Sequence, residues 1–253
     1  MDLFDSDNLQ GSFGPQLPFE LPHEPGYAAV RDEALRAFLV TLPQGEILYA
    51  DGFFSPQTAS RSVEYFQENR QCDWRSAEFP ARVRRDLAGL QFENINWQQD
   101  AMRIYGKVLP LPRLTAWYGD RGRSYTYSGI KSEPNPWNKG LLYLKRQVEG
   151  VAGVSFNSVL LNWYRDGEDC VGWHADDEKH LGRNPVIASA SFGETRDFVV
   201  RRKDDKSRKI VFPLGQGSLL IMRGELQHYW EHAVPRRAGV KGSRFNLTFR
   251  SIQ

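Results

Sequence analysis

The sequence has little cysteine and no long apolar run. Its two cysteines, Cys72 and Cys170, are too few for a disulfide scaffold and are typical of a reducing compartment. No segment approaches the roughly 18 consecutive apolar residues that a membrane span needs. The N-terminal residues also lack a basic stretch followed by an apolar one, which would indicate a secretory signal. We therefore expect a protein that is neither secreted nor embedded in a membrane.

The net charge of the whole chain is close to zero, but the net charges of its two ends are not. The formal charge of the 253 residues is +2, yet residues 1–30 sum to −5 and residues 201–253 to +8. Beyond a Debye length of about 8 Å these two ends do not neutralise each other. The basic end indicates a polyanionic partner, although solvated Lys and Arg on a plain surface are the commoner explanation.

The composition, 40% hydrophobic and 25% charged, is that of an ordinary globular protein. Residues 1–30 lack periodicity and predict a flexible acidic arm, which leaves 31–253 as a single domain. Apolar spacing predicts a helix over 31–42, and Ser55 followed by Pro56 predicts the start of a second. A third is predicted over 134–150, opened by Pro136 and ended by Gly150.

From residue 155 onward, short runs rich in β-branched and aromatic residues recur between Gly, Pro and Asp. These runs are 158–164, 185–192, 196–203, 209–214, 218–222 and 244–252. Because no helical pattern separates them, they predict an antiparallel sandwich or barrel rather than βαβ units. The fold class that follows is α+β, with helices first and an all-β half after them.

Histidine is scarce, and one of the five stands in a metal-binding pattern. His174 and Asp176 are two residues apart, so on an extended chain both side chains leave the same face. Either His228 or His232 could complete a set of two histidines and one carboxylate, which is typical of non-haem Fe(II) oxygenases. A polar strand edge is the commoner explanation of an isolated His-x-Asp.

The last predicted strand alternates strictly between polar and apolar residues. Its polar face carries Arg244, Asn246, Thr248 and Arg250. Asn162 and Tyr164, also two apart, share a face of an earlier strand. The polar face of 244–250 is either the solvent side of an edge strand or a pocket for a small dianion, because guanidinium groups bind carboxylates in pairs of hydrogen bonds.

These residues together resemble a known family, the AlkB-type dioxygenases, which remove alkyl groups from nucleic-acid bases with Fe(II) and 2-oxoglutarate. The resemblance covers about residues 47–250. Its motifs are N-x-Y at 162–164, H-x-D-D-E at 174–178, the run at 185–193, W-x-H-x-V-P at 230–235 and R-x-N-x-T-x-R at 244–250. It implies a double-stranded β-helix (jelly-roll) core over about 155–253 and a nucleotide-recognition hairpin region over about 90–130.

The resemblance also implies the ligands of the reaction centre. His174, Asp176 and His232 would hold Fe(II), which leaves His228 outside the set. The co-substrate 2-oxoglutarate would be held by Asn162, Tyr164, Arg244, Asn246, Thr248 and Arg250, and Arg250 counts with the three ligands as catalytic. With O2, the family's reaction yields succinate and CO2, hydroxylates the alkyl carbon, and releases formaldehyde from a methyl adduct.

The implied substrate contacts are less specific. Tyr127 would stack on a flipped base and Tyr125 would bond near it, although core aromatics are the commoner explanation of any single Tyr. Tyr105 would be the residue that fills the vacated base stack. The remaining substrate residues would be Arg113, Asp177 and Glu178. Asp177 and Glu178 could accept a hydrogen bond from an exocyclic amine, or form an acidic turn that orients the neighbouring carboxylate.

The leading hypothesis is a DNA demethylase that repairs bases such as 1-methyladenine and 3-methylcytosine. The alternatives are an RNA demethylase with the same chemistry and a catalytically silent nucleic-acid-binding relative. Basic loops at 201–209 and 236–241 would contact phosphates. We expect a monomer with a nucleic-acid partner, cytoplasmic and nucleoid-associated in a bacterium or nuclear in a eukaryote.

Overall fold

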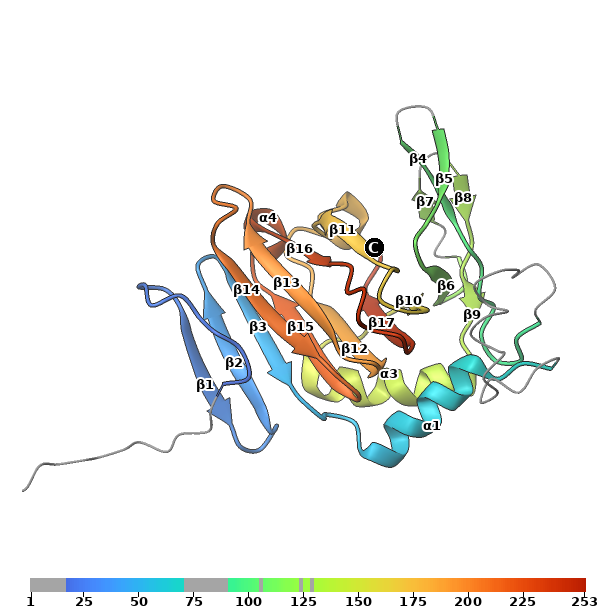
Figure 1. Ribbon diagram of the computed structural model, residues 1–253, viewed down its shortest axis with the longest axis horizontal. Coiled ribbons are helices and arrows are strands. Elements are labelled where there is room, and N and C mark those ends of the chain that lie inside the picture. The colour runs from blue at the N-terminus through green and yellow to red at the C-terminus, as the bar shows by residue number, and fades with distance from the viewer. Residues whose placement is uncertain (1–16, 71–90, 105–106, 123–124, 128–129) are drawn as a thin grey trace, which may run out of the picture.

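Two β-sheets face each other, and two helices cover the outer side of the larger sheet (Figure 1). The computed structural model describes residues 17–70, 91–104, 107–122, 125–127 and 130–253, and within 102–108 and 125–132 it describes the backbone alone. Among these residues, no helix is both long enough and apolar enough to cross a membrane.

The larger sheet has nine strands in the order β1-β2-β3-β15-β12-β17-β10-β6-β9. Their bounds are β1 Ala28–Asp32, β2 Ala37–Leu42, β3 Gly45–Ala50, β15 Ser218–Arg223, β12 Ile187–Gly193, β17 Arg244–Arg250, β10 Ser158–Tyr164, β6 Leu114–Gly119 and β9 Asn135–Pro136. Strand β17 is hydrogen-bonded to β10 on one side and to β12 on the other. The last strand is therefore an inner strand and not the edge strand that its arginines also allowed.

The smaller sheet has four strands, β11 Val171–His174, β16 Trp230–Val234, β13 Arg196–Arg202 and β14 Lys209–Leu214, in this order. Two hairpins project from the body: β4 Ala101–Ile104 with β5 Lys107–Pro110, and β7 Tyr125–Tyr127 with β8 Ile130–Ser132 (Figure 1). Single turns of helix occur at η1 Lys179–Leu181 and α4 Leu226–Tyr229. This strand-rich arrangement confirms the predicted α+β class with a jelly-roll core.

The inner strands of the larger sheet bury both faces, and the alternation of side chains divides the core in two. On the outer face, Phe245, Leu247 and Phe249 of β17 join the cluster that the helices cover. On the inner face, residues such as Leu220 and Met222 of β15 meet the smaller sheet. The polar residues of β17 point to this inner side, so the space between the two sheets is where a ligand site can form.

Two of the three predicted helices are present. Helix α1, Pro56–Gln67, begins after Ser55, whose hydroxyl accepts a hydrogen bond from the Thr58 main-chain N–H. Helix α3, Lys139–Ala152, begins later and ends later than predicted, capped by Asn138 and by Gly153 at a φ of 70°. Gly153, and not Gly150, adopts the left-handed conformation that ends a helix without steric cost.

The prediction of a helix over 31–42 is wrong, because this segment forms the β1–β2 hairpin. Phe38, Val40 and Leu42 alternate into the core between the sheets, and Leu35 lies in the turn. The apolar spacing of so short a segment fits both the helical period of about 3.6 residues and the strand period of two. The pairing of β2 with β3 decides in favour of the strand. The first element among the described residues is therefore a strand and not a helix.

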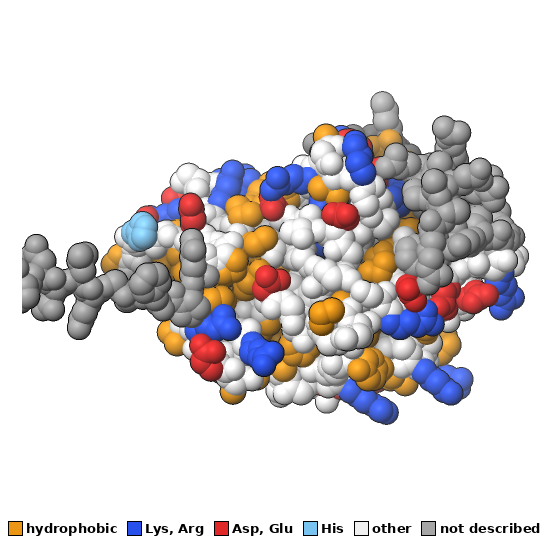
Figure 2. Space-filling model, turned by 60° about the horizontal axis from the view of Figure 1, so that its bottom comes forward, with side chains coloured by type: hydrophobic (Ala, Val, Ile, Leu, Met, Phe, Trp, Pro, Cys, Tyr) orange, Lys and Arg blue, Asp and Glu red, His pale blue; other side chains and the backbone are white. Residues whose placement is uncertain are grey.

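The described part of the predicted acidic arm packs against the protein. Phe19 is buried, and its ring meets Phe38, Tyr49 and Phe212. Residues 1–16 of the arm predicted over 1–30 lie outside the described residues. On the side that carries α1 and α3, acidic and basic side chains are interspersed (Figure 2). That face therefore does not concentrate charge of one sign.

Candidate metal and co-substrate site

Three side chains from the smaller sheet and the loop after it meet at one point. His174 ends β11, Asp176 follows two residues later, and His232 lies opposite His174 on β16. One nitrogen or oxygen donor from each of the three lies within 4.8 Å of the other two. His228, the alternative that spacing left open, is exposed and contacts Asn184 instead.

The hydrogen bonds around these residues leave metal-binding atoms available. The Nδ1–H of His174 donates to the carbonyl of Gly172 at 2.8 Å, which leaves Nε2 with a free lone pair. Oδ1 of Asp176 accepts a hydrogen bond from Arg250 at 2.8 Å, whereas the buried Oδ2 has no protein partner. A buried oxygen without a partner is costly unless a cation or a donor meets it.

The electrostatics keep each of these groups in the form that binds a metal. Burial, with the neighbouring His174 next in importance, lowers the pKa of His232 to about 3, so its imidazole is neutral. Burial alone would raise the pKa of Asp176, but Arg250, His232 and His174 outweigh it and lower the pKa, so the carboxylate is ionised. The 4.0 Å between His232 Nε2 and Asp176 Oδ2 is therefore not an ion pair. Two neutral imidazoles and one carboxylate fit Fe(II).

A cavity of about 60 Å³ adjoins the three residues and lies between the two sheets. Its polar lining comes from Arg113, Asn162, Tyr164, His174, Asp176, Ser189, His232, Arg244, Asn246, Thr248 and Arg250. All six residues predicted to hold the co-substrate, and all three predicted metal ligands, thus face one space. Val171, Phe198, Met222 and Val234 supply part of its apolar lining.

Arg244 is the residue that most clearly requires a ligand. Its side chain is 1% exposed, its Nη2 donates to the hydroxyl of Ser191 at 2.9 Å, and its Nε and Nη1 have no protein acceptor. Burial lowers the pKa of this guanidinium to about 10, which still leaves it charged at neutral pH. A buried cation with free donors is stabilised when an anion supplies the missing acceptors, and a carboxylate fits a guanidinium with two parallel hydrogen bonds.

The amides of the cavity are held by the protein itself. Asn246 donates to Ser189 Oγ at 2.7 Å and accepts from Thr248 Oγ1 at 2.9 Å. Asn162 accepts from Arg113 Nε at 2.7 Å, so Arg113, predicted as a substrate contact, here braces the co-substrate wall. These bonds fix the shape of the pocket before any ligand enters, as a preorganised site requires.

Comparison with known proteins identifies the family. Residues 46–250 match the model of the 2OG-Fe(II) oxygenase superfamily. The chain belongs to this superfamily. It is therefore an Fe(II)- and 2-oxoglutarate-dependent dioxygenase, and the metal and co-substrate expected from the sequence are confirmed.

The relatives within this superfamily are of the AlkB type. The chain is 38% identical over 226 residues to human alpha-ketoglutarate-dependent dioxygenase alkB homolog 3, an overlap of 83% of this chain and 74% of that protein. The cattle protein of the same name is 50% identical over 150 residues. The match covers 56% of this chain and 52% of the cattle protein. Human DNA oxidative demethylase ALKBH2 is 44% identical over 158 residues, 60% of each chain.

The fold of the dioxygenase also matches a solved structure. That of OsALKBH1 aligns with a TM-score of 0.50 at 16% identity, over 84% of this chain and 99% of that one. At this identity the likeness concerns the fold alone.

The structure describes the side chains of only some of the predicted substrate residues of the dioxygenase. Asp177 is exposed and pairs with Lys203 at 3.2 Å, and Glu178 is half-buried directly before η1. Tyr125 and Tyr127 begin and end β7, of which only the backbone is described. Tyr105 lies outside the described residues.

Most of the basic residues predicted to contact phosphate are paired with acids. On the β13–β14 hairpin, four of them form ion pairs: Arg201 with Glu231, Arg202 with Asp204, Lys203 with Asp177, and Arg208 with Glu24 and Asp205. Arg237 pairs with Asp197. Lys206 and Lys209 are exposed and form no such pair among the described residues.

Sequence reasoning missed residues that hold the site from behind. Ser189 and Ser191 on β12 bond to Asn246 and Arg244, and the alternation of residues 187–193 could have placed them on the inner face. Gln227 is buried in α4, and its Oε1 accepts the main-chain N–H of Asp176 at 2.9 Å. No spacing signal points to Gln227, because its partner lies 51 positions away along the chain.

Proposed function

We propose that this dioxygenase demethylates N-alkylated bases, of the 1-methyladenine and 3-methylcytosine type, in DNA. The observation that carries the proposal is the joint geometry of the donors of His174, Asp176 and His232 and the free donors of Arg244 around one cavity. The kinship with a protein named DNA oxidative demethylase supports the choice of DNA.

Each part of the site has a task in this reaction. His174 Nε2, Asp176 Oδ2 and His232 would hold Fe(II), which supplies O2-dependent oxidation of 2-oxoglutarate and of the alkyl carbon. Arg244 would bind the distal carboxylate of 2-oxoglutarate with Nε and Nη1, the two donors that lack protein acceptors. Arg250 would keep the metal-binding carboxylate ionised and oriented through its bond to Asp176 Oδ1. The products would be succinate, CO2, formaldehyde and the unmodified base.

The substrate would reach the site as a flipped or unpaired base. Asp177 and Glu178 follow the ligand Asp176 directly, so in this proposal their carboxylates select bases with an exocyclic amine. Tyr125 and Tyr127 would contact the base, Tyr105 would fill the vacated stack, and Arg113 would act through the co-substrate wall. Exposed lysines of the β13–β14 hairpin would contact the phosphate backbone, and the enzyme would act as a monomer in the compartment that holds the cell's DNA.

The test is turnover on defined oligonucleotides. Purified enzyme with Fe(II), ascorbate and 2-oxoglutarate should release formaldehyde and succinate from a 1-methyladenine oligonucleotide, and His174→Ala should abolish both. Binding of iron and oligonucleotide by the wild type without either product would contradict the proposal. The exposed His228→Ala serves as the matched control and should retain turnover.

Parallel substrates decide between DNA and RNA. Duplex DNA, single-stranded DNA and RNA with the same lesion should be processed with DNA preferred, and a preference for RNA would favour the alternative. Tyr105→Ala should lose more activity on duplex than on single-stranded DNA. Equal losses on both would reject a stack-filling role for this residue.

A further inference from the structure

Arg196 is a fully buried guanidinium that does not line the cavity. It is the first residue of β13, and its side chain is 1% exposed. A charge at this depth costs free energy unless its donors are satisfied. The groups that Arg196 bonds therefore indicate what this residue holds in place.

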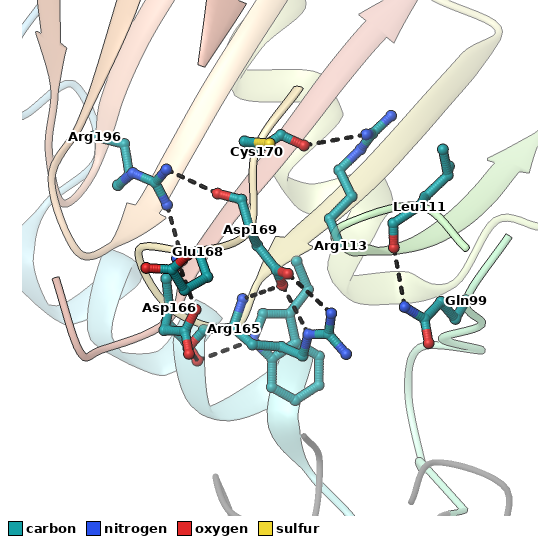
Figure 3. Close-up of polar contacts among 11 residues, drawn as sticks. Gln99, Leu111, Arg113, Arg165, Asp166, Glu168, Asp169, Cys170 and Arg196 are labelled. Carbon is teal, nitrogen blue, oxygen red and sulfur yellow. Dashed lines mark hydrogen bonds and ion pairs between the residues drawn. The ribbon is translucent and has the colours of Figure 1, made fainter. Parts of the chain in front are cut away.

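All three hydrogen bonds that Arg196 donates go to main-chain carbonyl oxygens. Nη1 donates to Asp166 at 3.0 Å, and Nη2 donates to Asp169 at 2.8 Å and to Pro235 at 2.6 Å (Figure 3 shows the first two). Asp166 and Asp169 belong to the loop that joins β10 to β11, and Pro235 directly follows β16. One side chain thus connects the ends of three strands that carry predicted ligands.

The pair formed by β11 and β16 is short and irregular, so it needs such a connection. The strands pair at Val171 with Val234 and at His174 with His232, and the register shifts between these two positions. A bulge leaves a residue unpaired and disrupts the ladder locally, so main-chain hydrogen bonds hold these two strands together at few positions. The carbonyls that Arg196 bonds flank the Val171–Val234 end of this pair, and Arg196 fixes that end on β13.

Arg196 also supports one wall of the co-substrate pocket. Its guanidinium carbon lies 5.6 Å from the centroid of the Tyr164 ring, and that of Arg244 lies 5.1 Å from the same centroid. Both distances are within the range of cation–π contacts. Arg244 retains two donors, Nε and Nη1, for a ligand, whereas both terminal nitrogens of Arg196 bond to the protein and only its Nε lacks an acceptor.

The loop that Arg196 bonds is also held by hydrogen bonds of its own. Arg165 binds the carboxylate of Asp169 through Nε at 2.7 Å and Nη2 at 2.9 Å, and its main-chain N–H adds a third bond (Figure 3). At the end of the loop, Arg113 donates to the Cys170 carbonyl at 3.4 Å and to Asn162. A shift of this braced loop would therefore move the co-substrate wall as one unit.

We propose that Arg196 is a positioning residue, which holds Tyr164 and the shared end of β11 and β16 so that the pocket is preformed for 2-oxoglutarate. This inference rests on the assignment of 2-oxoglutarate to this pocket. The metal-binding atoms lie toward the other end of the two strands, at the His174–His232 pair. Loss of Arg196 thus weakens co-substrate binding more than metal binding.

The experiment measures binding by calorimetry, without turnover, in the whole 253-residue chain. Mn(II) replaces Fe(II), and the affinities for Mn(II) alone and for 2-oxoglutarate with Mn(II) bound are compared. Arg196→Gln removes the charge and the forked donors, and Arg196→Lys retains only the charge. Val148→Ala in α3, buried on the outer face of the large sheet, is the control for reduced stability.

We expect Arg196→Gln to bind 2-oxoglutarate at least tenfold more weakly, with Mn(II) affinity within threefold of wild type and Arg196→Lys in between. An Arg196→Gln affinity for 2-oxoglutarate equal to that of Val148→Ala would overturn the inference, as would an equal loss of Mn(II) and 2-oxoglutarate affinity. Failure of both Arg196 variants to fold would also overturn it, because Arg196 would then serve folding. Absence of 2-oxoglutarate binding in the wild type would instead refute the co-substrate assignment itself.

Discussion

The arginine in the pocket, Arg244, and two arginines on the β13–β14 hairpin, Arg201 and Arg202, differ in their burial and in the acceptors that their donors meet. Arg244 is buried, and two of its donor groups meet no protein acceptor. Arg201 and Arg202 are half-buried, and each is paired with a carboxylate, Glu231 and Asp204 respectively. All three contribute to the same excess of positive charge in the sequence, yet among them only Arg244 has buried donors without a protein acceptor.

The difference separates a binding site from a basic surface. A surface ion pair contributes about 0–1 kcal/mol and competes with any incoming phosphate for the same cation. A buried cation without a full set of acceptors costs stability, and the protein recovers that cost when an anion binds. Two unused donors on one buried guanidinium beside a cavity, and not the number of positive residues, mark the place where the ligand binds.

Arg244→Met tests this contrast with the largest expected effect. It should weaken 2-oxoglutarate binding by more than about 100-fold, since two charge-assisted hydrogen bonds contribute roughly 3 kcal/mol or more. The thermal stability of the ligand-free protein should stay equal or rise, because the variant no longer buries a charge. Calorimetric binding and a melting curve measure both.

Arg202→Met is the matched control on the hairpin. It should leave 2-oxoglutarate affinity unchanged. A large fall in the melting temperature of ligand-free Arg244→Met would contradict the contrast, because the buried guanidinium would then be stabilising by itself.

The pH dependence of stability tests whether burial at the metal site also costs stability in the absence of the ligand. The pKa of His232 is depressed in the folded state to about 3, whereas an unfolded histidine titrates near its ordinary value of about 6.5. Below pH 6.5 the unfolded state takes up the proton first, so the metal-free protein should lose up to about 1.4 kcal/mol of stability per pH unit down to pH 3. Above pH 6.5 this contribution is constant.

Denaturant unfolding of the metal-free protein between pH 7 and pH 5 measures this slope. His232→Gln should flatten it, whereas Val148→Ala should lower stability equally at both pH values. A slope that persists unchanged in His232→Gln would place its origin in other groups.

Gln227→Leu should have an intermediate effect. The substitution leaves the main-chain N–H of Asp176 without its buried acceptor, which loosens the metal-binding carboxylate. We expect metal affinity to fall about tenfold. Gln99→Leu, which also removes one hydrogen bond to the main chain, at Leu111, is the control and should not change metal affinity. Equal metal affinity in the two variants would exclude a role for Gln227.

The hairpin should give the smallest effect. Lys206→Ala combined with Lys209→Ala should reduce the slope of log affinity for duplex DNA against log salt by up to roughly 0.9 for each phosphate that the variant no longer neutralises. Arg202→Ala should change it less, because Arg202 is already bound to Asp204. A larger change in Arg202→Ala than in the double lysine variant would show that the ion pair opens on DNA.

Local patterns in the sequence predicted the parts of the site that lie on single strands. The spacing of His174 and Asp176 and the alternation over 244–250 follow from strand geometry, and the structure confirms that Arg244, Asn246, Thr248 and Arg250 share the inner face. The choice of His232 over His228 depends on which residue pairs with β11, a contact between distant segments. Residue spacing alone could therefore not distinguish His232 from His228 as the third metal ligand.

The residues that the sequence did not reveal act through contacts between distant segments. Arg196 bonds carbonyls 27 to 39 positions away, and main-chain carbonyls carry no signature in the sequence. The wrong prediction of a helix over 31–42 has the same origin. Its apolar spacing suits both a helix and a strand, and pairing with β3 selects the strand. Local periodicity thus specifies which side chains share a face, and tertiary pairing specifies what that face meets.

Strand β17 makes the catalytic pocket and the hydrophobic core depend on one alignment. Its polar residues face the cavity and its phenylalanines and leucine face the helices, and it is bonded to strands on both sides. Deleting a single residue within it would exchange the two faces for every residue beyond the deletion. Arginine would then enter the apolar layer and phenylalanine the pocket. A change of one residue in the length of this strand would therefore disrupt the core and the pocket together, whereas a single substitution affects the face on which it lies.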